Sequence, residues 1–255
     1  TVTQLVQRLS GDNALDTMSA IVDSGFTELG GTVVLATGSG YWDALTASGI
    51  AGLAKAPVLL TSIDGGTLSS QTASELSRLK PSTLIVCGGT GAVSDSVVSQ
   101  AKSASGATRV VRCSGDTAVG TANDIFAKAG SATGKSFGDT AFVATNDGYW
   151  DALAVAPYAY SKGCPIFLSN AAASISDETL SAMKDGGIKN VYIVGGTAAV
   201  SDNVKSQIAA YGMTVVDRLW GNTAVETSSA IAAFELGHGM SADGMAVATN
   251  DGFKS

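Results

Sequence analysis

The stretch Leu84-Ile-Val-Cys-Gly-Gly-Thr-Gly-Ala-Val-Ser94 decides the fold, because it returns as Val191-Tyr-Ile-Val-Gly-Gly-Thr-Ala-Ala-Val-Ser201. In each copy a short apolar run rich in β-branched residues, typical of a buried strand, ends in a pair of glycines. A Ser-Asp pair follows, which is a common helix start. The strand, the tight turn and the helix start recur at the spacing of an ordinary domain. We therefore predict tandem α/β domains.

Two further landmarks recur in the same order along the chain. Tyr41-Trp-Asp-Ala-Leu45 returns as Tyr149-Trp-Asp-Ala-Leu153. An opening motif runs from Arg8 to Thr17, from Arg112 to Thr121 and from Arg218 to Thr227. The period exceeds the roughly 20–50 residues of solenoid repeats. We therefore expect three tandem repeats, at residues 1–110, 111–217 and 218–255, the third of them truncated.

Each repeat alternates apolar β-branched runs with Ala- and Leu-rich segments. Strict alternation predicts a small parallel sheet with helices on both faces. In the first repeat we expect strands at 32–37, 57–61, 84–87 and 109–113, and helices at 43–55, 69–79, 94–103 and 116–129. In the second repeat we expect strands at 141–145, 165–169, 191–194 and 214–218, and helices at 151–162, 176–184 and 201–211. The third repeat is expected to hold its first helix and a strand at 245–249.

Composition excludes several classes of protein. With 45% hydrophobic and 15% charged residues, the 255-residue chain can build a real core. A net charge of −7 and no basic stripe argue against a nucleic-acid partner. No apolar run reaches the length of a transmembrane segment. The chain starts at Thr1, shows no signal peptide and stops inside the third repeat, so we expect a fragment of a longer protein.

The three cysteines, Cys87, Cys113 and Cys164, form no even disulfide framework and have no metal-ligand spacing. We expect them to be small buried apolar residues. Neither glycine turn completes a dinucleotide-binding or P-loop motif. The sequence therefore predicts no metal and no cofactor.

These landmarks together resemble the bacterial cell-wall-binding repeat 2 family. The family's Asp-Ala-Leu helix start is matched at Asp43 and Asp151, and its Pro-Ile-Leu-Leu strand at 57–60 and 165–168. Its glycine turn is matched at 84–94 and 192–201, and its opening motif at each of the three arginines. The match covers nearly all of the chain.

The resemblance implies a secreted Gram-positive surface protein, of S-layer or related type, with its effector domain elsewhere. It also implies three Rossmann- or Toprim-like repeats that associate with pseudo-threefold symmetry, within the chain or with another copy. Their implied partner is an anionic cell-wall polysaccharide, held non-covalently.

The chain departs from the family in three ways. Ala14, Ala118 and Ala224 stand where the family has a second arginine. Trp42 and Trp150 stand where it often has proline, and the third repeat is incomplete. The missing arginines leave the identity of the polymer open.

Two sets of residues are candidates for polymer contact. The turns at Gly89-Thr90 and Gly196-Thr197 can aim backbone N–H groups, and the positive end of the following helix, at an anion. Alternatively, the glycines only permit a tight turn. Arg8, Arg112 and Arg218 can pair with phosphate or carboxylate groups. Their alternative is a structural bridge to a neighbouring repeat or to a carboxylate such as Asp12 or Asp116.

Other polar residues give weaker signals. Asp43 and Asp151 follow Tyr-Trp pairs that could contact a sugar, although packing against a neighbouring repeat is the simpler interpretation. The one histidine, His238, lies outside the repeated motifs, and no Ser-His-Asp set recurs. An enzyme would need a polar cluster confined to one repeat, and the sequence shows none, so we predict no catalytic residues.

We therefore expect a non-catalytic anchoring module that holds a secreted protein on the wall through several weak sites. The acidic net charge requires a local basic groove or bridging cations for this binding. A structural or adhesive S-layer-type module is the alternative.

Overall fold

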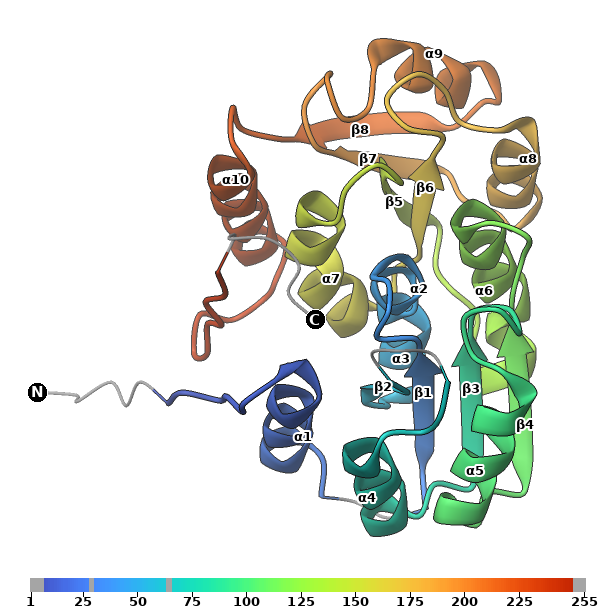
Figure 1. Cartoon of the computed structure of the whole chain (residues 1–255). Coiled ribbons are helices and arrows are strands. Elements are labelled where there is room, and N and C mark those ends of the chain that lie inside the picture. The colour runs from blue at the N-terminus through green and yellow to red at the C-terminus, as the bar shows by residue number, and fades with distance from the viewer. Residues whose placement is uncertain (1–6, 28–29, 63–65, 250–255) are drawn as a thin grey trace, which may run out of the picture.

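The computed structural model describes residues 7–27, 30–62 and 66–249. They form two similar halves, each a four-stranded parallel sheet between helices (Figure 1). The strand orders are β2-β1-β3-β4 and β6-β5-β7-β8, so the second half repeats the topology of the first. This confirms the predicted fold class, and we call the halves repeat one and repeat two.

Repeat one begins with the helix of its opening motif and ends with the edge strand β4. Its elements are α1 (Ala14–Gly25), β1 (Thr32–Ala36), α2 (Trp42–Thr46), α3 (Ser48–Ala54), β2 (Val58–Leu60), α4 (Ser70–Leu79), β3 (Thr83–Cys87), α5 (Asp95–Ser105) and β4 (Arg109–Cys113).

Repeat two follows the same order, and one more opening helix, α10, comes after it. The elements are α6 (Ala118–Thr133), β5 (Thr140–Thr145), α7 (Trp150–Lys162), β6 (Ile166–Ser169), α8 (Asp177–Asp185), β7 (Asn190–Val194), α9 (Asp202–Ala210), β8 (Thr214–Leu219) and α10 (Ala224–Gly237).

Each sheet has a core on both of its faces. In repeat one, Leu76 of α4 packs with Leu35 on one face, and Ile50 of α3 packs with Val34 on the other. Leu76 and Leu79 are buried, as their helical spacing predicts. All three cysteines are also buried, as expected of small apolar residues.

The opening helix α6 joins the two repeats. Its Ile125 is buried in the core of repeat one, whereas its Val119 packs against Leu168 of β6 in repeat two. Figure 1 shows α6 beside both sheets. One helix thus contributes to two cores.

Helices α3 and α7 pack together at the centre of the interface between the repeats. A Cβ atom on Gly52 of α3 would lie 1.9 Å from the carbonyl oxygen of Tyr160, and one on Gly49 would lie 2.2 Å from that of Cys164. Real side chains cannot approach backbone so closely, so glycine at these positions allows the contact.

Two sequence predictions are wrong in detail. The single helix expected over 43–55 is divided at Ala47 into α2 and α3. The Thr46 hydroxyl donates to the Trp42 carbonyl within this segment, a contact that bends helices. Residues 245–249 form no strand: Met245 and Val247 are 73% and 91% exposed, and they pair with no strand of the described residues.

Candidate functional site

The glycine turns lie at the carboxyl edge of each sheet, which is the edge where the parallel strands end. Gly88 and Gly195 have φ of 120° and 104°, a conformation that side chains disfavour. Gly88 N–H donates to the Cys113 carbonyl and Gly195 N–H to that of Leu219. Each turn is thereby fastened to the neighbouring edge strand.

The second glycine and the threonine of each turn reach the surface. Thr90 and Thr197 are exposed, and Gly89 and Gly196 are half-buried. Within the described chain, the backbone N–H groups of these four residues donate to no partner. Each turn therefore offers free donors to a ligand.

Two of the repeated arginines, Arg112 and Arg218, form hydrogen bonds to these turns. Arg112 Nη1 donates to the carbonyls of Gly88 (2.8 Å) and Val93 (2.9 Å), and Nη2 pairs with Asp95 (3.0 Å). Arg218 forms the same three contacts one repeat later, with Gly195 (3.0 Å), Val200 (2.6 Å) and Asp202 (3.0 Å). The carboxylate partner is thus the first residue of the following helix, rather than Asp12 or Asp116.

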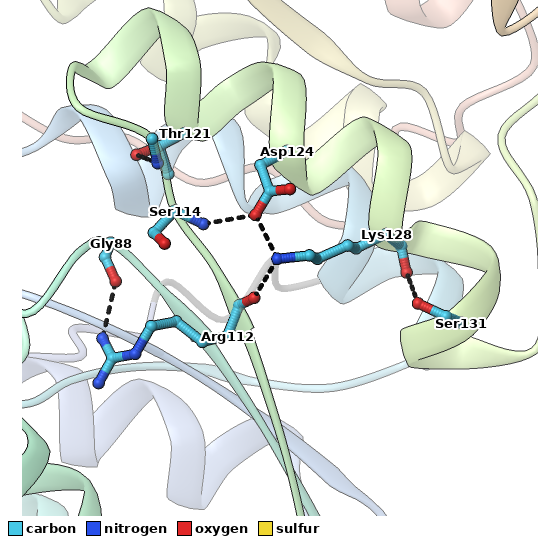
Figure 2. A network of polar contacts seen from close by, with 8 residues as sticks. Gly88, Arg112, Ser114, Thr121, Asp124, Lys128 and Ser131 are labelled. Atoms are coloured by element: carbon cyan, nitrogen blue, oxygen red, sulfur yellow. Dashed lines mark hydrogen bonds and ion pairs between the residues drawn. The ribbon is translucent and has the colours of Figure 1, made fainter.

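Arg112 is also tied to α6 through its backbone, as Figure 2 shows. Its carbonyl accepts from Lys128 Nζ at 2.9 Å, and the same ammonium group pairs with Asp124 at 2.7 Å. Asp124 in turn accepts the Ser114 N–H at 2.7 Å. The network connects β4, the opening motif and α6 in one polar cluster.

The third predicted arginine is placed differently. Arg8 is exposed, and it forms no hydrogen bond or ion pair with the described residues. Arg112 lies on β4 and Arg218 on β8, and they hold the turns that follow β3 and β7, whereas Arg8 bonds to no turn within the described residues. Its guanidinium group is therefore free for another partner.

The helix that follows each turn is a weaker anion site than the sequence suggested. Helices α5 and α9 begin only at Asp95 and Asp202, several residues beyond the glycines. These acids lie in the first helical turn, where they balance the helix dipole, and they also pair with arginines. The turns, by contrast, carry backbone N–H groups that donate to no partner among the described residues.

An aspartate from the start of α2 or α7 stands against the first glycine of each turn. A Cβ atom on Gly88 would lie 2.6 Å from Asp43 Oδ2, and one on Gly195 would lie 2.3 Å from Asp151 Oδ2. Burial raises the pKa of both carboxyls above the usual range. The Thr121 hydroxyl, which donates to Asp43, acts to lower the pKa of that residue.

Aromatic side chains line the boundary between the repeats at this edge. The Tyr41 and Tyr149 rings lie 5.0 Å apart, and Trp42 Nε1 donates to the Asn146 carbonyl at 2.7 Å. These contacts agree with the packing interpretation of the Tyr-Trp pairs. Trp150, the counterpart of Trp42, is 43% exposed and forms no such bond within the described chain.

A cleft of about 270 Å³ opens beside the turn of repeat two. Thr145, Asp147, Trp150 and Asp151 line one side, and the loops after β6 and β7 contribute Ala172 and Ala199. No motif in the sequence pointed to this cleft, because its walls come from three separate loops.

Other kinds of site find no support in the described part of the chain. No group of three or more His, Cys, Asp or Glu residues there could hold a metal ion. Among those same residues, no helix is long and apolar enough to cross a membrane. His238 lies at the end of α10, where its ring stacks on Phe234 at 4.0 Å.

The fold and the repeated edge define a class of protein: a tandem α/β module that presents the same turn in successive repeats. The model of the cell wall binding domain 2 family matches residues 8–98 and 112–205, and the chain belongs to this family. The resemblance seen in the sequence is thus confirmed. As a domain of this family, the chain is a non-catalytic module.

Two curated relatives come from Bacillus subtilis. The chain is 35% identical over 203 residues to the N-acetylmuramoyl-L-alanine amidase LytC and 32% identical over 200 residues to an amidase enhancer. These alignments cover 80% and 78% of the chain, but only 38% and 25% of the relatives. The chain thus spans well under half the length of either relative.

Two solved structures from Clostridium difficile share the fold. Cwp6 matches 93% of the chain with a TM-score of 0.80 and 25% identity, and Cwp8 matches 88% with a TM-score of 0.74 and 24% identity. The chain covers 38% and 36% of those two proteins. Both likenesses extend over the two repeats.

Proposed function

We propose that this module binds an anionic polymer of the Gram-positive cell wall non-covalently, and so retains a secreted protein at the cell surface. The observation that carries the proposal is the duplicated turn. Both segments that match the family include it, and both copies present free backbone N–H donors at an exposed edge.

Backbone donors suit this task in an acidic protein. A net charge of −7 opposes general attraction of a polyanion. N–H groups that converge in a turn bind anionic oxygens without adding a positive side chain. Two weak sites on one polymer then bind more tightly than either site alone.

The arginines divide into two roles within this proposal. Arg112 and Arg218 position the turns, because their guanidinium groups are already bonded to turn carbonyls. Arg8 is the arginine that is free to contact the polymer or a further repeat.

Association with a further repeat is the second part of the proposal, and the opening helices support it. In α6, Val119 and Ile125 are both buried, one in each repeat. In α10, Ile231 at the position of Ile125 is buried, whereas Val225 at the position of Val119 is 56% exposed.

Helix α1 shows the reverse pattern. Its Leu15, at the position of Val119, is buried, but its Ile21, at the position of Ile125, is 49% exposed. A third repeat would cover Val225 with its sheet edge and Ile21 with its helices. Figure 1 shows α1 and α10 on the same side of the molecule, as pseudo-threefold closure requires.

The boundaries between the repeats at residues 110 and 217 remain predictions.

Co-sedimentation with purified Gram-positive walls tests the binding proposal. We expect the chain to pellet with intact walls and to stay in solution after acid extraction has removed the anionic polymer. Equal pelleting with both kinds of wall would contradict a polymer partner.

The alternative, a structural or adhesive S-layer-type module, is favoured by the exposed apolar residues Val225 and Leu236 of α10. It predicts open-ended self-association without walls. Sedimentation velocity at increasing protein concentration separates the two functions, because closure with a further repeat gives a species of one fixed size, whereas an S-layer-type module forms assemblies that keep growing with concentration.

A further inference from the structure

The cleft of repeat two differs in character from the turn beside it. The turn offers N–H donors to an acceptor, whereas Asp147 and Asp151 offer carboxylate oxygens to a donor. None of the described residues that line the cleft is basic. An anionic group would be repelled there, because like charges facing each other disfavour binding.

The cleft lies where the topology of the sheet favours a ligand. The chain passes from β5 to β6 on one side, and then returns across β5 to β7 on the other side. Loops that diverge from adjacent strands in this way leave a crevice at the carboxyl edge of a parallel sheet. Thr145 at the end of β5 and Ala199 in the loop after β7 mark its two walls.

The lining of the cleft combines a flat apolar surface with charged acceptors. Trp150 packs over Gly148, where a Cβ atom would lie 3.2 Å from its ring. The ring also stacks on that of Tyr149 at 4.4 Å, and the residue remains 43% exposed. Asp147 is exposed beside it. Such a surface stacks against the C–H face of a sugar ring, while carboxylates accept hydrogen bonds from its hydroxyl or amino groups.

A second exposed tryptophan lies beside the same turn. The Trp220 ring comes within 3.5 Å of where a Cβ atom on Gly196 would lie, and it is 50% exposed. Repeat one has Ser114 at this position and Ser39 in place of Asp147. Of the residues around the cleft, Asp147 and Trp220 are therefore particular to repeat two.

We propose that the cleft formed by Asp147, Trp150 and Asp151 binds an uncharged or amino-bearing sugar unit, and that the acidic groups of the ligand lie outside it. The inference rests on the proposed wall binding and names the part of the polymer that repeat two recognises. The adjacent N–H groups of Gly196 and Thr197 are placed for the acceptor groups of the same chain.

Docking of a further repeat leaves this surface usable. Trp42 keeps 37% of its surface exposed although its indole N–H is bonded to repeat two. The same contact made by Trp150 would leave a comparable part of its surface exposed.

The test uses a neutral probe, the oligosaccharide released from the wall polymer by hydrofluoric acid, which removes phosphate. Saturation-transfer NMR and calorimetry measure its binding to the chain, with inorganic phosphate as the charged comparison. We expect the oligosaccharide to bind, and D147N and W150A each to weaken it by about tenfold, as loss of a charged hydrogen bond or a stacking contact does.

Two control variants make the test specific. W150F keeps a stacking ring and is expected to retain most of the affinity. D185N removes another exposed carboxylate, from the end of α8 at the opposite edge of the sheet, and should leave binding unchanged.

The results separate the two proposals. If the chain pellets with intact walls but the neutral oligosaccharide does not bind, the cleft inference fails and wall binding stands. Oligosaccharide binding that D147N and W150A leave intact would also overturn the cleft inference. If the chain does not pellet with intact walls, the proposed wall binding fails.

Discussion

The carboxyl edges of the two repeats carry the same turn in different surroundings. In repeat one, Trp42 donates to Asn146, and Asp43 accepts from Thr121, so residues of repeat two complete the edge. In repeat two, Trp150 and Asp151 have no such partner among the described residues. The comparison teaches that one sequence motif makes a more closed or a more open edge, depending on which residues of another repeat contact it.

The largest expected effect comes from disrupting the packing of α3 against α7, which holds the two repeats together. A methyl group on Gly52 would overlap the Tyr160 carbonyl in the α3–α7 interface. We expect G52A to destabilise the protein by about 3 kcal/mol, as overpacking against backbone does. Denaturant unfolding measures the loss.

Gly25 provides the matched control for this change. It ends helix α1 and has no atom within 4 Å of a built Cβ atom. G25A should therefore leave stability unchanged or slightly raised. A G52A protein as stable as G25A would show that the repeats do not pack through these glycines.

The next largest effect concerns Arg112 and Arg218, whose bonds to the turns are compared between the two repeats. Arg112 and Arg218 form matching sets of three contacts, so R112A and R218A should each cost about 2 kcal/mol. R8A should leave stability unchanged, because Arg8 is exposed and unbonded within the described chain. Urea unfolding of the three variants measures these differences.

Wall co-sedimentation of the same variants separates structure from binding. Weaker pelleting of a stable R8A protein would assign Arg8 to polymer contact. If R8A destabilised the protein as much as R112A, the two-role division of the arginines would be wrong.

The tryptophans give the most direct comparison of the two edges. W42F removes the indole donor to Asn146 and should cost about 1 kcal/mol, the usual net value of one hydrogen bond. W150F removes an indole that has no described acceptor, so stability should not change. Equal losses in thermal or urea unfolding would contradict the view that repeat one is closed and repeat two open.

The sequence predicted the strands, the turns and the repeated architecture, because these depend on local patterns. The apolar run before Gly88 and the Ser-Asp pair after it specify a strand and a helix start without reference to the rest of the chain. The burial of the cysteines followed from composition in the same way.

The role of the arginines and the cleft could not be predicted in the same manner. Arg112 and Asp95 are separated by a whole strand and helix, and any of several nearby acids could have been the partner. The cleft needs Asp147, Ala172 and Ala199 to meet from three loops. Residues 245–249 also show this limit. Their sequence is typical of a strand, but a strand forms only beside neighbouring strands, and the local sequence does not determine whether such neighbours are present.

The smallest expected effect concerns the aspartates beside the turns. Burial raises the pKa of Asp151 in the folded protein, so ionising this carboxyl opposes folding. Its favourable contribution is present below the ordinary pKa of aspartate and is lost as pH rises through the raised value. D151N should therefore raise the melting temperature at neutral pH, and the gain should shrink towards about pH 4. D43N should gain less, because it also weakens the contact with Thr121. Melting curves of the three proteins across this range measure the difference, and a D151N protein that is less stable than wild type at neutral pH would show that the Asp151 charge is stabilised by its surroundings.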